Sequence, residues 1–333
     1  MKWLQASGLG NVIHCLLGCA PMLVLAAGIA NAQDYPSKPV RIVVGFSAGG
    51  SNDIVARYVA PKLGEILGAQ VIVENRPGAN AIIAMELVAK SAPDGYTLML
   101  GGVSPLVLNP LIYSKIPYDT LKDFAGLTTV ARIPQWIVVH PSLPARSLKE
   151  FIALAKSRPG KINFGSAGTG GIGHLTIELL KIDAGINIQH VAYKGLAPGL
   201  TDVVGGQIEG VISDIPAMIP HLKAGKLRAL AVPSEQRAPL LPDVPTALEQ
   251  GFPALIAVNW LAVVAPAKTP RPIVEKLHAA LVKAATLPDM KERFLSVGNE
   301  SATNSSPEAF GGYLREELSR WSKVVREAGV HAD

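Results

Sequence analysis

Hydrophobic positions in the first part of the chain alternate between short β-branched runs and longer stretches of helical spacing. Val40–Val44 has the composition of a buried parallel strand. Apolar residues then recur at helical spacing up to Leu67, although Pro61 and Gly64 should kink or interrupt that helix. The elements predicted here are strands at 40–44, 71–74 and 96–100 and helices at 53–67 and 81–90. Such alternation predicts a parallel sheet with helices on its faces.

The same rhythm returns in the second half and then changes after Trp260. Strands are predicted at 161–164, 186–192, 208–213 and 227–232, and helices at 148–156, 174–181, 198–204 and 217–224. One more strand is predicted at 261–264, followed by helices alone at 273–285, 288–297 and 307–328. Helices without further strands must pack on a sheet made earlier. We therefore expect the C-terminal segment to return to the first lobe, so that the chain crosses twice between lobes.

Two glycine-rich segments, at 45–53 and 164–174, each follow a β-branched run and open a helical pattern. A strand that ends at glycines before a helix leaves backbone N–H groups unpaired at the positive end of the helix dipole. Such groups can hold an anion. We therefore predict that the two loops bind one small anionic ligand from opposite sides. Within the first loop, Ser51 or Asn52 should cap the helix and Asp53 should bond back to loop amides or solvent.

The second loop also has the spacing of a dinucleotide-binding motif, at Gly168, Gly170 and Gly173. That motif needs an acidic residue at the end of the next strand, and residues 189–194 contain none. We therefore predict no nucleotide cofactor.

Catalytic chemistry has little support in the residue pattern. A triad of Ser166, His174 and Asp214 would lack the nucleophile elbow, because the glycine before the serine is adjacent rather than two positions back. His174 is better explained as a donor that braces the loop or as a polar ligand contact. No histidine pair has metal-binding spacing, so we predict no metal and no enzyme activity.

Composition fits a two-lobed protein with a well-filled core. The chain has 333 residues, of which 49% are hydrophobic and 17% charged. The net charge of +5 is spread along the chain without a run of basic residues, which argues against nucleic acid as a partner.

The first 32 residues read as a secretory signal peptide. Lys2 precedes an apolar stretch that is densest at Pro21–Ile29 and ends in the small residues Ala30–Ala32, so we predict cleavage after Ala32 and a periplasmic protein. A membrane anchor is the competing interpretation, but the apolar part is shorter than the about 20 residues that a spanning helix needs. Lipid attachment at Cys19 is a third interpretation. Both cysteines, Cys15 and Cys19, lie in this segment.

Several ordered motifs give the chain a family resemblance over nearly its whole mature length. They are Gly49–Arg57, Glu74–Ala79, Pro93–Leu98, Ile116–Asp119, Asp123–Phe124, Asn163–Gly168 and Tyr193–Gly195. In this order they resemble the Bug (TctC-like) family of periplasmic solute-binding proteins of tripartite tricarboxylate transporters. The resemblance implies a Venus-flytrap fold of two α/β lobes around a cleft. Lobe I would comprise residues 33–134 and 257–333, and lobe II residues 135–256.

The resemblance also implies a small carboxylate ligand, held by loop N–H groups and ordered water. The ligand contacts expected from it are Phe46, Ala48, Gly49, Gly50, Asp53, Ser166, Ala167, Gly168, Thr169 and His174, with Lys194 and Asp214 at the rim or floor. We expect a monomer that delivers this ligand to the membrane subunits of a tripartite tricarboxylate-type transporter. A sensory protein that presents ligand to a receptor remains the alternative, followed by an enzyme on a similar scaffold.

Two departures from the family pattern bear on the ligand. Asn80–Ile82 stands where the family usually has more glycine, so the resemblance does not predict the backbone path of that loop. Gly170–Gly173 stands where small hydroxylated residues are common before the histidine. Fewer hydroxyls mean fewer direct hydrogen bonds to the far end of a ligand. We therefore hypothesise a ligand with one firmly held carboxylate and a less polar or water-bridged remainder.

Overall fold

A computed structural model of the chain describes residues 35–332. The predicted signal peptide, with Cys15, Cys19 and the cleavage site after Ala32, lies outside the described residues. Residues from Lys38 onward form one compact unit that contains two β-sheets.

The first sheet has six strands in the order β11-β4-β10-β3-β1-β2. Strands β1, β2 and β3 pair in parallel, as the alternating pattern predicted. Strand β10 runs antiparallel to both β3 and β4, so this sheet is mixed rather than parallel throughout. The strands are β1 (Val40–Val44), β2 (Val71–Asn75), β3 (Thr97–Gly102), β4 (Phe124–Pro134), β10 (Val258–Pro266) and β11 (Glu300–Ser301).

The second sheet has five strands in the order β7-β6-β8-β5-β9. Its strands β6, β7 and β8 pair in parallel, whereas β5 is antiparallel to its neighbours β8 and β9. The strands are β5 (Trp136–Val139), β6 (Asn163–Ser166), β7 (Gln189–Ala192), β8 (Gly210–Ser213) and β9 (Arg228–Ala231).

Helices separate most of the strands along the chain. The predicted helix at 53–67 begins two residues earlier and continues through Pro61, because its apolar side, which includes Val55, Val59 and Leu63, is fully buried. The helices are α1 (Ser51–Leu67), α2 (Ile82–Ala89), α3 (Asn109–Ile112), α4 (Leu148–Ser157), α5 (Ile172–Ala184), α6 (Leu196–Val204), α7 (Ile219–Lys223), α8 (Arg271–Thr286), α9 (Pro288–Ser296) and α10 (Pro307–Ala328). Two short helical turns, η1 (Ala79–Ala81) and η2 (Ser104–Leu108), precede α2 and α3.

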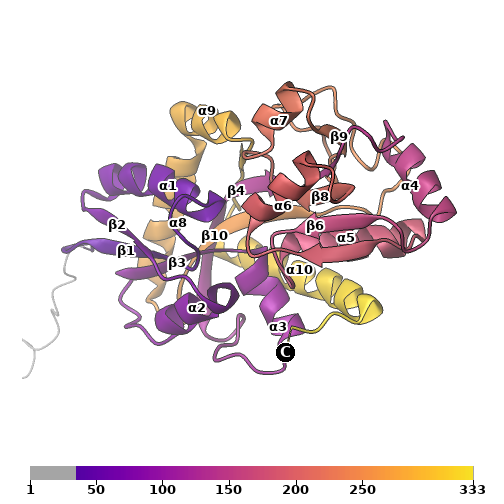
Figure 1. The fold of residues 1–333 in the computed structure, drawn as a ribbon. Coiled ribbons are helices and arrows are strands. Elements are labelled where there is room, and N and C mark those ends of the chain that lie inside the picture. The colour runs from indigo at the N-terminus through magenta and orange to yellow at the C-terminus, as the bar shows by residue number, and fades with distance from the viewer. Residues whose placement is uncertain (1–34, 333) are drawn as a thin grey trace, which may run out of the picture. The chain divides into compact units, whose positions relative to one another are not determined.

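The chain passes between the sheets twice. It leaves the first sheet through Gln135, the single residue between β4 and β5, and returns through residues 232–257, between β9 and β10. Figure 1 shows α1, α2 and β1–β3 grouped in one region, and α4–α7 with β6, β8 and β9 in another. This is the two-lobed α/β arrangement with two crossings that the sequence predicted.

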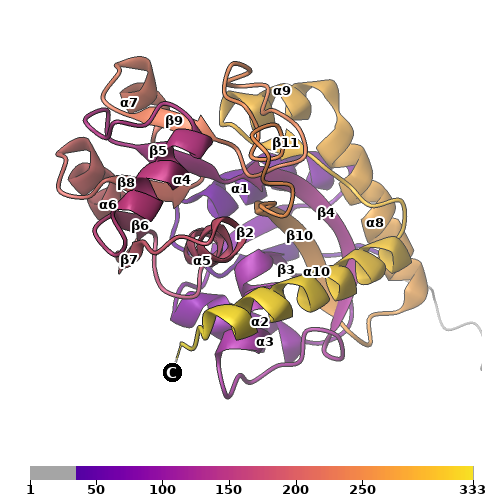
Figure 2. The same ribbon diagram turned by 90° about the vertical axis from the view of Figure 1, so that its right-hand side faces the viewer.

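The C-terminal segment differs from its prediction in one respect. Helices alone were expected after 264, but Glu300 and Ser301 form β11, which pairs with Arg132 and Ala131 of β4. The last helix, α10, packs on β4 and α3 and also on α5, and Figure 2 shows it beside both helices. Among the helices of residues 35–332, none combines the length and apolar character that crossing a membrane requires.

Candidate functional site

The first glycine loop joins β1 to α1. Gly49 has a φ of 82°, a value that favours glycine, and Gly50 is the N-cap residue of α1. Ser51 and Asn52, predicted as caps, instead lie inside the first turn of the helix, and no side chain caps it. The first backbone N–H groups of a helix have no partner within the helix. They are therefore available, at the positive end of the helix dipole, to an anion.

Asp53 holds the first loop in shape. Its buried carboxylate accepts hydrogen bonds from the Gly49 N–H (2.9 Å), Arg57 Nε (2.9 Å) and Asn75 Nδ2 (2.9 Å). Asn75 Nδ2 also donates to the Phe46 carbonyl, at 3.0 Å. Burial opposes ionisation of the carboxyl group, but these donors outweigh it and the pKa of Asp53 lies below its ordinary value. The carboxylate is thus ionised and engaged with the loop itself.

The second glycine loop joins β6 to α5 in a matching way. Gly168 and Gly170 have φ values of 148° and 75°, and Gly171 is the N-cap of α5, again without a side-chain cap. By contrast, α4 is capped by Ser147, which accepts from the Glu150 N–H, and α10 by Ser306. Both helices that follow the glycine loops therefore present uncapped N-termini.

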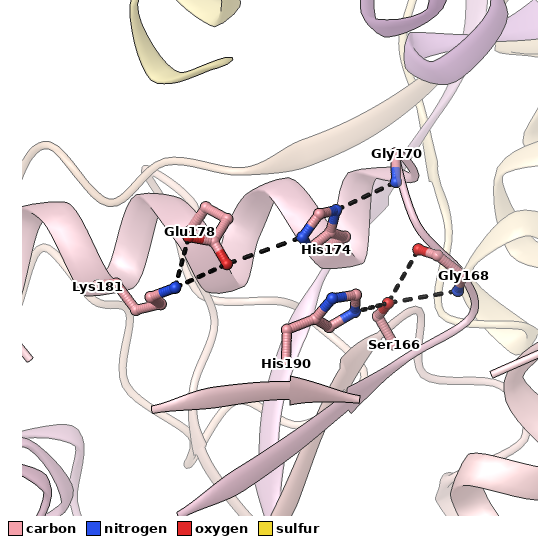
Figure 3. A network of polar contacts seen from close by, with 7 residues as sticks. All are labelled: Ser166, Gly168, Gly170, His174, Glu178, Lys181 and His190. Atoms are coloured by element: carbon pink, nitrogen blue, oxygen red, sulfur yellow. Dashed lines mark hydrogen bonds and ion pairs between the residues drawn. The ribbon is translucent and has the colours of Figure 1, made fainter. Parts of the chain in front are cut away.

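A stacked pair of histidines holds the second loop (Figure 3). The rings of His174, on α5, and His190, on β7, lie 3.9 Å apart between centroids and 17° from parallel. His174 Nδ1 accepts from the Gly170 N–H at 3.1 Å, so the neutral ring carries its proton on Nε2, 3.7 Å from Glu178 Oε1. Glu178 in turn pairs with Lys181 at 2.7 Å.

His190 reaches the loop through Ser166. His190 Nε2 lies 2.7 Å from Ser166 Oγ, which lies 3.1 Å from the Gly168 carbonyl oxygen and 3.3 Å from the Gly168 nitrogen. With its proton on Nε2, His190 donates to the serine hydroxyl, which then donates to the carbonyl. Burial lowers the pKa of His174 to about 4, with Lys181 contributing, and burial together with the neighbouring His174 lowers that of His190 to about 4. Both rings are neutral at neutral pH.

The two loops open onto one cavity of about 560 Å³. From the first loop and the start of α1 it is lined by Phe46, Gly49, Gly50, Ser51, Asn52 and Ile54. From the second loop and the start of α5 it is lined by Ala167, Gly168, Thr169, Gly171, Ile172 and Gly173. A further wall is formed by residues 212–214 and 216–217, at and after the end of β8, and by residues 196–197, at the start of α6. The uncapped N-termini of α1 and α5 therefore meet at the same cavity. Each of these helices follows a strand of a different sheet.

The cavity gathers some of the predicted contact residues and not others. Those that line it are Phe46, Gly49, Gly50, Ala167, Gly168, Thr169 and Asp214. Ala48 and Lys194 are exposed and lie outside its lining. Asp53, Ser166 and His174 also lie outside it, because their side chains are buried behind the loops and bonded to loop backbone.

Polar residues at the crossings between the sheets were missed. Gln135 lines the cavity from the first crossing, Asn259 from the start of β10 just after the second crossing, and Ser104 from η2. Asn259 Oδ1 also accepts from the Val103 N–H at 3.3 Å. These side chains come together only because the chain crosses twice, and no local motif marks them.

Ser51 and Asp214 connect the two sides of the cavity. The hydroxyl of Ser51, the first residue of α1, donates a hydrogen bond to Asp214 Oδ2, just after β8. Ser213 Oγ donates to Asp214 Oδ1 at 3.0 Å. The aspartate is thus tied both to its own strand and to the opposite helix.

A larger cavity, of about 650 Å³, lies between β4, β10 and α10 and is lined by Arg132, Tyr313, Glu317 and Arg320 among others. Glu317 there already accepts from Trp260 Nε1 and from Arg320. Neither glycine loop contributes to its lining, so we place the candidate site in the smaller cavity.

Two α/β lobes with a cavity between facing glycine loops define a periplasmic binding protein, and solved structures of that class share this fold. Residues 55–330 match the family described as "Tripartite tricarboxylate transporter family receptor" (TctC). The chain belongs to this family, whose members are periplasmic solute-binding proteins, not enzymes.

Individual relatives agree with this assignment. The chain is 37% identical to Protein BugT of Bordetella pertussis over 319 residues, covering 95% of this chain and 98% of that one. The solved structure of Rpa4515 of R. palustris with adipate is 35% identical, with a TM-score of 0.80, and covers 89% of this chain and 99% of that one. MatC of Rhodopseudomonas palustris with bound malate is 31% identical, with a TM-score of 0.76 and coverages of 87% and 100%.

Proposed function

We propose that the protein captures a small carboxylate-bearing organic anion in the cleft and delivers it to a tripartite tricarboxylate-type transporter. The observation that carries this proposal is the meeting of two uncapped helix N-termini, those of α1 and α5, at one cavity. Unpaired N–H groups and the positive ends of two helix dipoles favour a carboxylate there. The adipate and malate in the structures of Rpa4515 and MatC support the same class of ligand.

The residues divide into two proposed roles. Direct contacts are proposed for Phe46, Gly49, Gly50, Ala167, Gly168, Thr169 and Asp214, which line the cavity. A positioning role is proposed for Asp53, Ser166 and His174, whose side chains bond to the loops from behind. Ala48 remains a proposed contact from the first loop, and Lys194 remains expected at the rim or floor.

Lobe I is proposed to comprise residues 33–134 and 257–333, and lobe II residues 135–256, a division that the strand membership of the two sheets supports. A ligand that contacts both lobes would favour their closed arrangement, and the two crossings near Gln135 and Asn259 would act as the hinge. We also propose export with cleavage after Ala32. A mature N-terminus at Gln33, found by mass spectrometry, would support this, whereas a lipidated Cys19 would refute it.

A matched pair of glycine substitutions tests the site. Gly49 and Gly68 have φ values of 82° and 70°, and a Cβ added at either would meet no atom within 4 Å. Gly49→Val and Gly68→Val should therefore lower stability by similar amounts, about 1–2 kcal/mol. Only Gly49 lines the cavity, whereas Gly68 ends α1 at its far terminus.

Calorimetric titration with a panel of mono-, di- and tricarboxylates should show saturable binding by the wild type and by Gly68→Val. Gly49→Val should lose about tenfold or more in affinity, since each tenfold corresponds to 1.4 kcal/mol. Equal affinities in the two variants would remove the first loop from the site. Absence of binding to every carboxylate would refute the proposed function.

A further inference from the structure

The cavity of about 650 Å³ has no role in the proposed function, although its volume is that of a small-molecule site. It is enclosed by β4, β10, the segment that follows β11, and α10, which packs on β4 (Figure 2). Part of the return crossing, at residues 253–256, completes its wall. No described residue lines both this cavity and the cleft, so the two are separate.

Three hydrogen-bond donors in this cavity have no partner within residues 35–332. The Arg132 guanidinium donates no hydrogen bond there and has no carboxylate within 4.0 Å. The Tyr313 hydroxyl donates none either. Asn304 Oδ1 accepts from the Thr129 N–H and from Thr129 Oγ1, both at 2.9 Å, which leaves Asn304 Nδ2 as a free donor. Three free donors from three elements suit an oxyanion as ligand.

The carboxylates near these donors are either engaged or exposed. Glu317 already accepts hydrogen bonds on both of its oxygens. Glu235 and Glu316 line the cavity but are exposed, where water and salt screen their charges. Glu300 stands opposite Arg132 in the pairing of β11 with β4, yet it forms no ion pair with it and does not line the cavity. Arg132 is thus available to an external anion.

Two aromatic rings line the cavity together with these donors. The centroids of the Trp260 and Tyr313 rings lie 5.6 Å apart, with the rings tilted by 59°, and Trp260 also meets the edge of Phe310 at 5.9 Å. Trp260 is directly opposite Arg132 in the pairing of β10 with β4, so both side chains lie on one face of the sheet. A flat ring can pack beside this cluster while its carboxylate forms two parallel hydrogen bonds with the guanidinium.

The cavity also adjoins the hinge. Asn259 lines the cleft, whereas its neighbours Val258 and Trp260 line this cavity, because successive residues of a strand point to opposite faces. Ile256, in the return crossing, lines it as well, and its carbonyl accepts from Arg320 Nη1 of α10 at 2.6 Å. A ligand in this cavity would therefore contact β10 and the crossing from the side opposite to the cleft.

We propose that this cavity is a second binding site for an aromatic carboxylate, held by Arg132, Asn304 and Tyr313, and that its occupation changes the affinity of the cleft. A ligand that touches the hinge binds the open and closed arrangements of the lobes unequally, and so shifts their equilibrium. The coupling rests on the proposed function, because it requires a ligand in the cleft, whereas the second site itself does not.

Three matched probes test the chemistry of the second site. Benzoate has both the flat ring and the charge, benzamide keeps the ring without the charge, and cyclohexanecarboxylate keeps the charge without the flat ring. Calorimetric titration of the wild-type protein should show saturable binding of benzoate. Benzamide should bind at least about tenfold more weakly and cyclohexanecarboxylate about fivefold more weakly. Equal binding of benzoate and benzamide would overturn the role of the guanidinium.

Variants assign the binding to this cavity. Arg132→Gln should weaken benzoate binding by about tenfold or more, and Tyr313→Phe, which keeps the ring, by about threefold or more. Arg315→Gln makes the same charge change at an exposed position of α10 outside the lining and should leave benzoate binding unchanged. Arg132 has no ion pair to lose, so the melting temperatures of the ligand-free variants should match that of the wild type. Full retention of benzoate binding by Arg132→Gln would refute the second site.

Titrating the cleft in the presence of saturating benzoate tests the coupling. The aliphatic carboxylate of the panel that binds most tightly should change its affinity by at least about fivefold in the wild type and not in Arg132→Gln. A change that persists in Arg132→Gln would mean that benzoate enters the cleft, and no change in either protein would overturn the coupling alone. If no aliphatic carboxylate binds, the proposed function and the coupling fail together, while loss of benzoate binding in Arg132→Gln would still support the second site.

Discussion

The two glycine loops present similar backbones to the cavity but are supported in opposite ways. The first is held by an ionised side chain, Asp53, which is bonded to Arg57, Asn75 and the Gly49 N–H. The second is held by two neutral, stacked histidines and a serine. The hydrogen bonds from a half-exposed arginine and its other donors favour the ionised form of Asp53, whereas burial favours the neutral form of the two histidines. The loops should therefore respond differently to mutation and to acid.

Removing the anchor of the first loop should produce the largest effect. Asp53→Ala removes the buried carboxylate that accepts from the Gly49 N–H, Arg57 and Asn75, so we expect the free energy of unfolding to fall by about 2 kcal/mol and carboxylate affinity to drop by tenfold or more. Urea unfolding and calorimetric titration measure the two quantities.

The control for this change is Asp94→Ala, which removes an exposed carboxylate that pairs with Lys38. It should leave affinity unchanged, because an exposed ion pair contributes little. If Asp53→Ala binds carboxylates as the wild type does, the aspartate does not organise the site.

Lowering the pH should destabilise the protein through the second loop before it affects the first. The pKa values of His174 and His190 are lowered to about 4 in the folded protein, whereas a histidine in the unfolded chain has a pKa of about 6.5. As pH falls through 6.5, the unfolded chain binds protons that the folded chain does not, so stability should decrease until about pH 4. The slope is at most about 1.4 kcal/mol per pH unit for each histidine. Urea unfolding at a series of pH values measures it.

Conservative variants assign this slope to the pair. His174→Asn can keep an acceptor for the Gly170 N–H, and His190→Gln a donor for Ser166, without a titrating ring. Each variant should reduce the pH dependence of the free energy of unfolding by the contribution of one histidine, which is at most about 1.4 kcal/mol per pH unit. The pKa of Asp53 is lowered, so its own contribution is present above the unfolded value, near about 3.9, and is lost only as pH falls further. A slope that both variants retain in full would show that other groups titrate in this range.

The smallest effect should come from removing the hydrogen bond between Ser51 and Asp214, which joins the two sides of the cavity. Ser51→Ala removes the hydroxyl that donates to Asp214 from the start of α1. Asp214 keeps Ser213 as a donor and is half-buried, so the change should lower stability by only about 1 kcal/mol. Affinity for carboxylates should fall by less than about tenfold. A loss as large as that of Asp53→Ala would mean that the link, rather than the loop anchor, dominates.

Local pattern predicted the elements that have a clear period, and missed those that do not. The strand at 40–44 and the helix at 307–328 were predicted with the bounds of β1 and α10. Strand β4 was missed, because Gly126 and two irregularities in its pairing with β10 obscure the alternation. Gly126 is needed there because the Phe310 ring occupies the space of a Cβ. The direction of β10 depends on its distant partners, which no local pattern records.

The residues of the candidate site also divide into those that a local pattern predicts and those that only the tertiary fold brings together. Gly49, Gly50 and Gly168 follow from a strand, glycines and a helix in succession, and they line the cavity. The burial of His174 against His190 could not be predicted, since the two rings come from α5 and β7. Gln135 and Asn259 reach the cavity because the chain crosses there, a property of the whole topology.

The glycine N-caps of α1 and α5 make the ligand part of the thermodynamic cycle of folding. Glycine in place of serine at such a position costs only a few tenths of a kcal/mol, so the exposed helix ends are inexpensive to maintain. Whatever occupies them binds the folded chain and not the unfolded one, and stabilises it by mass action. At about 100 times the dissociation constant this amounts to about 2.7 kcal/mol. The melting temperature would then act as a gauge of how fully the protein is loaded.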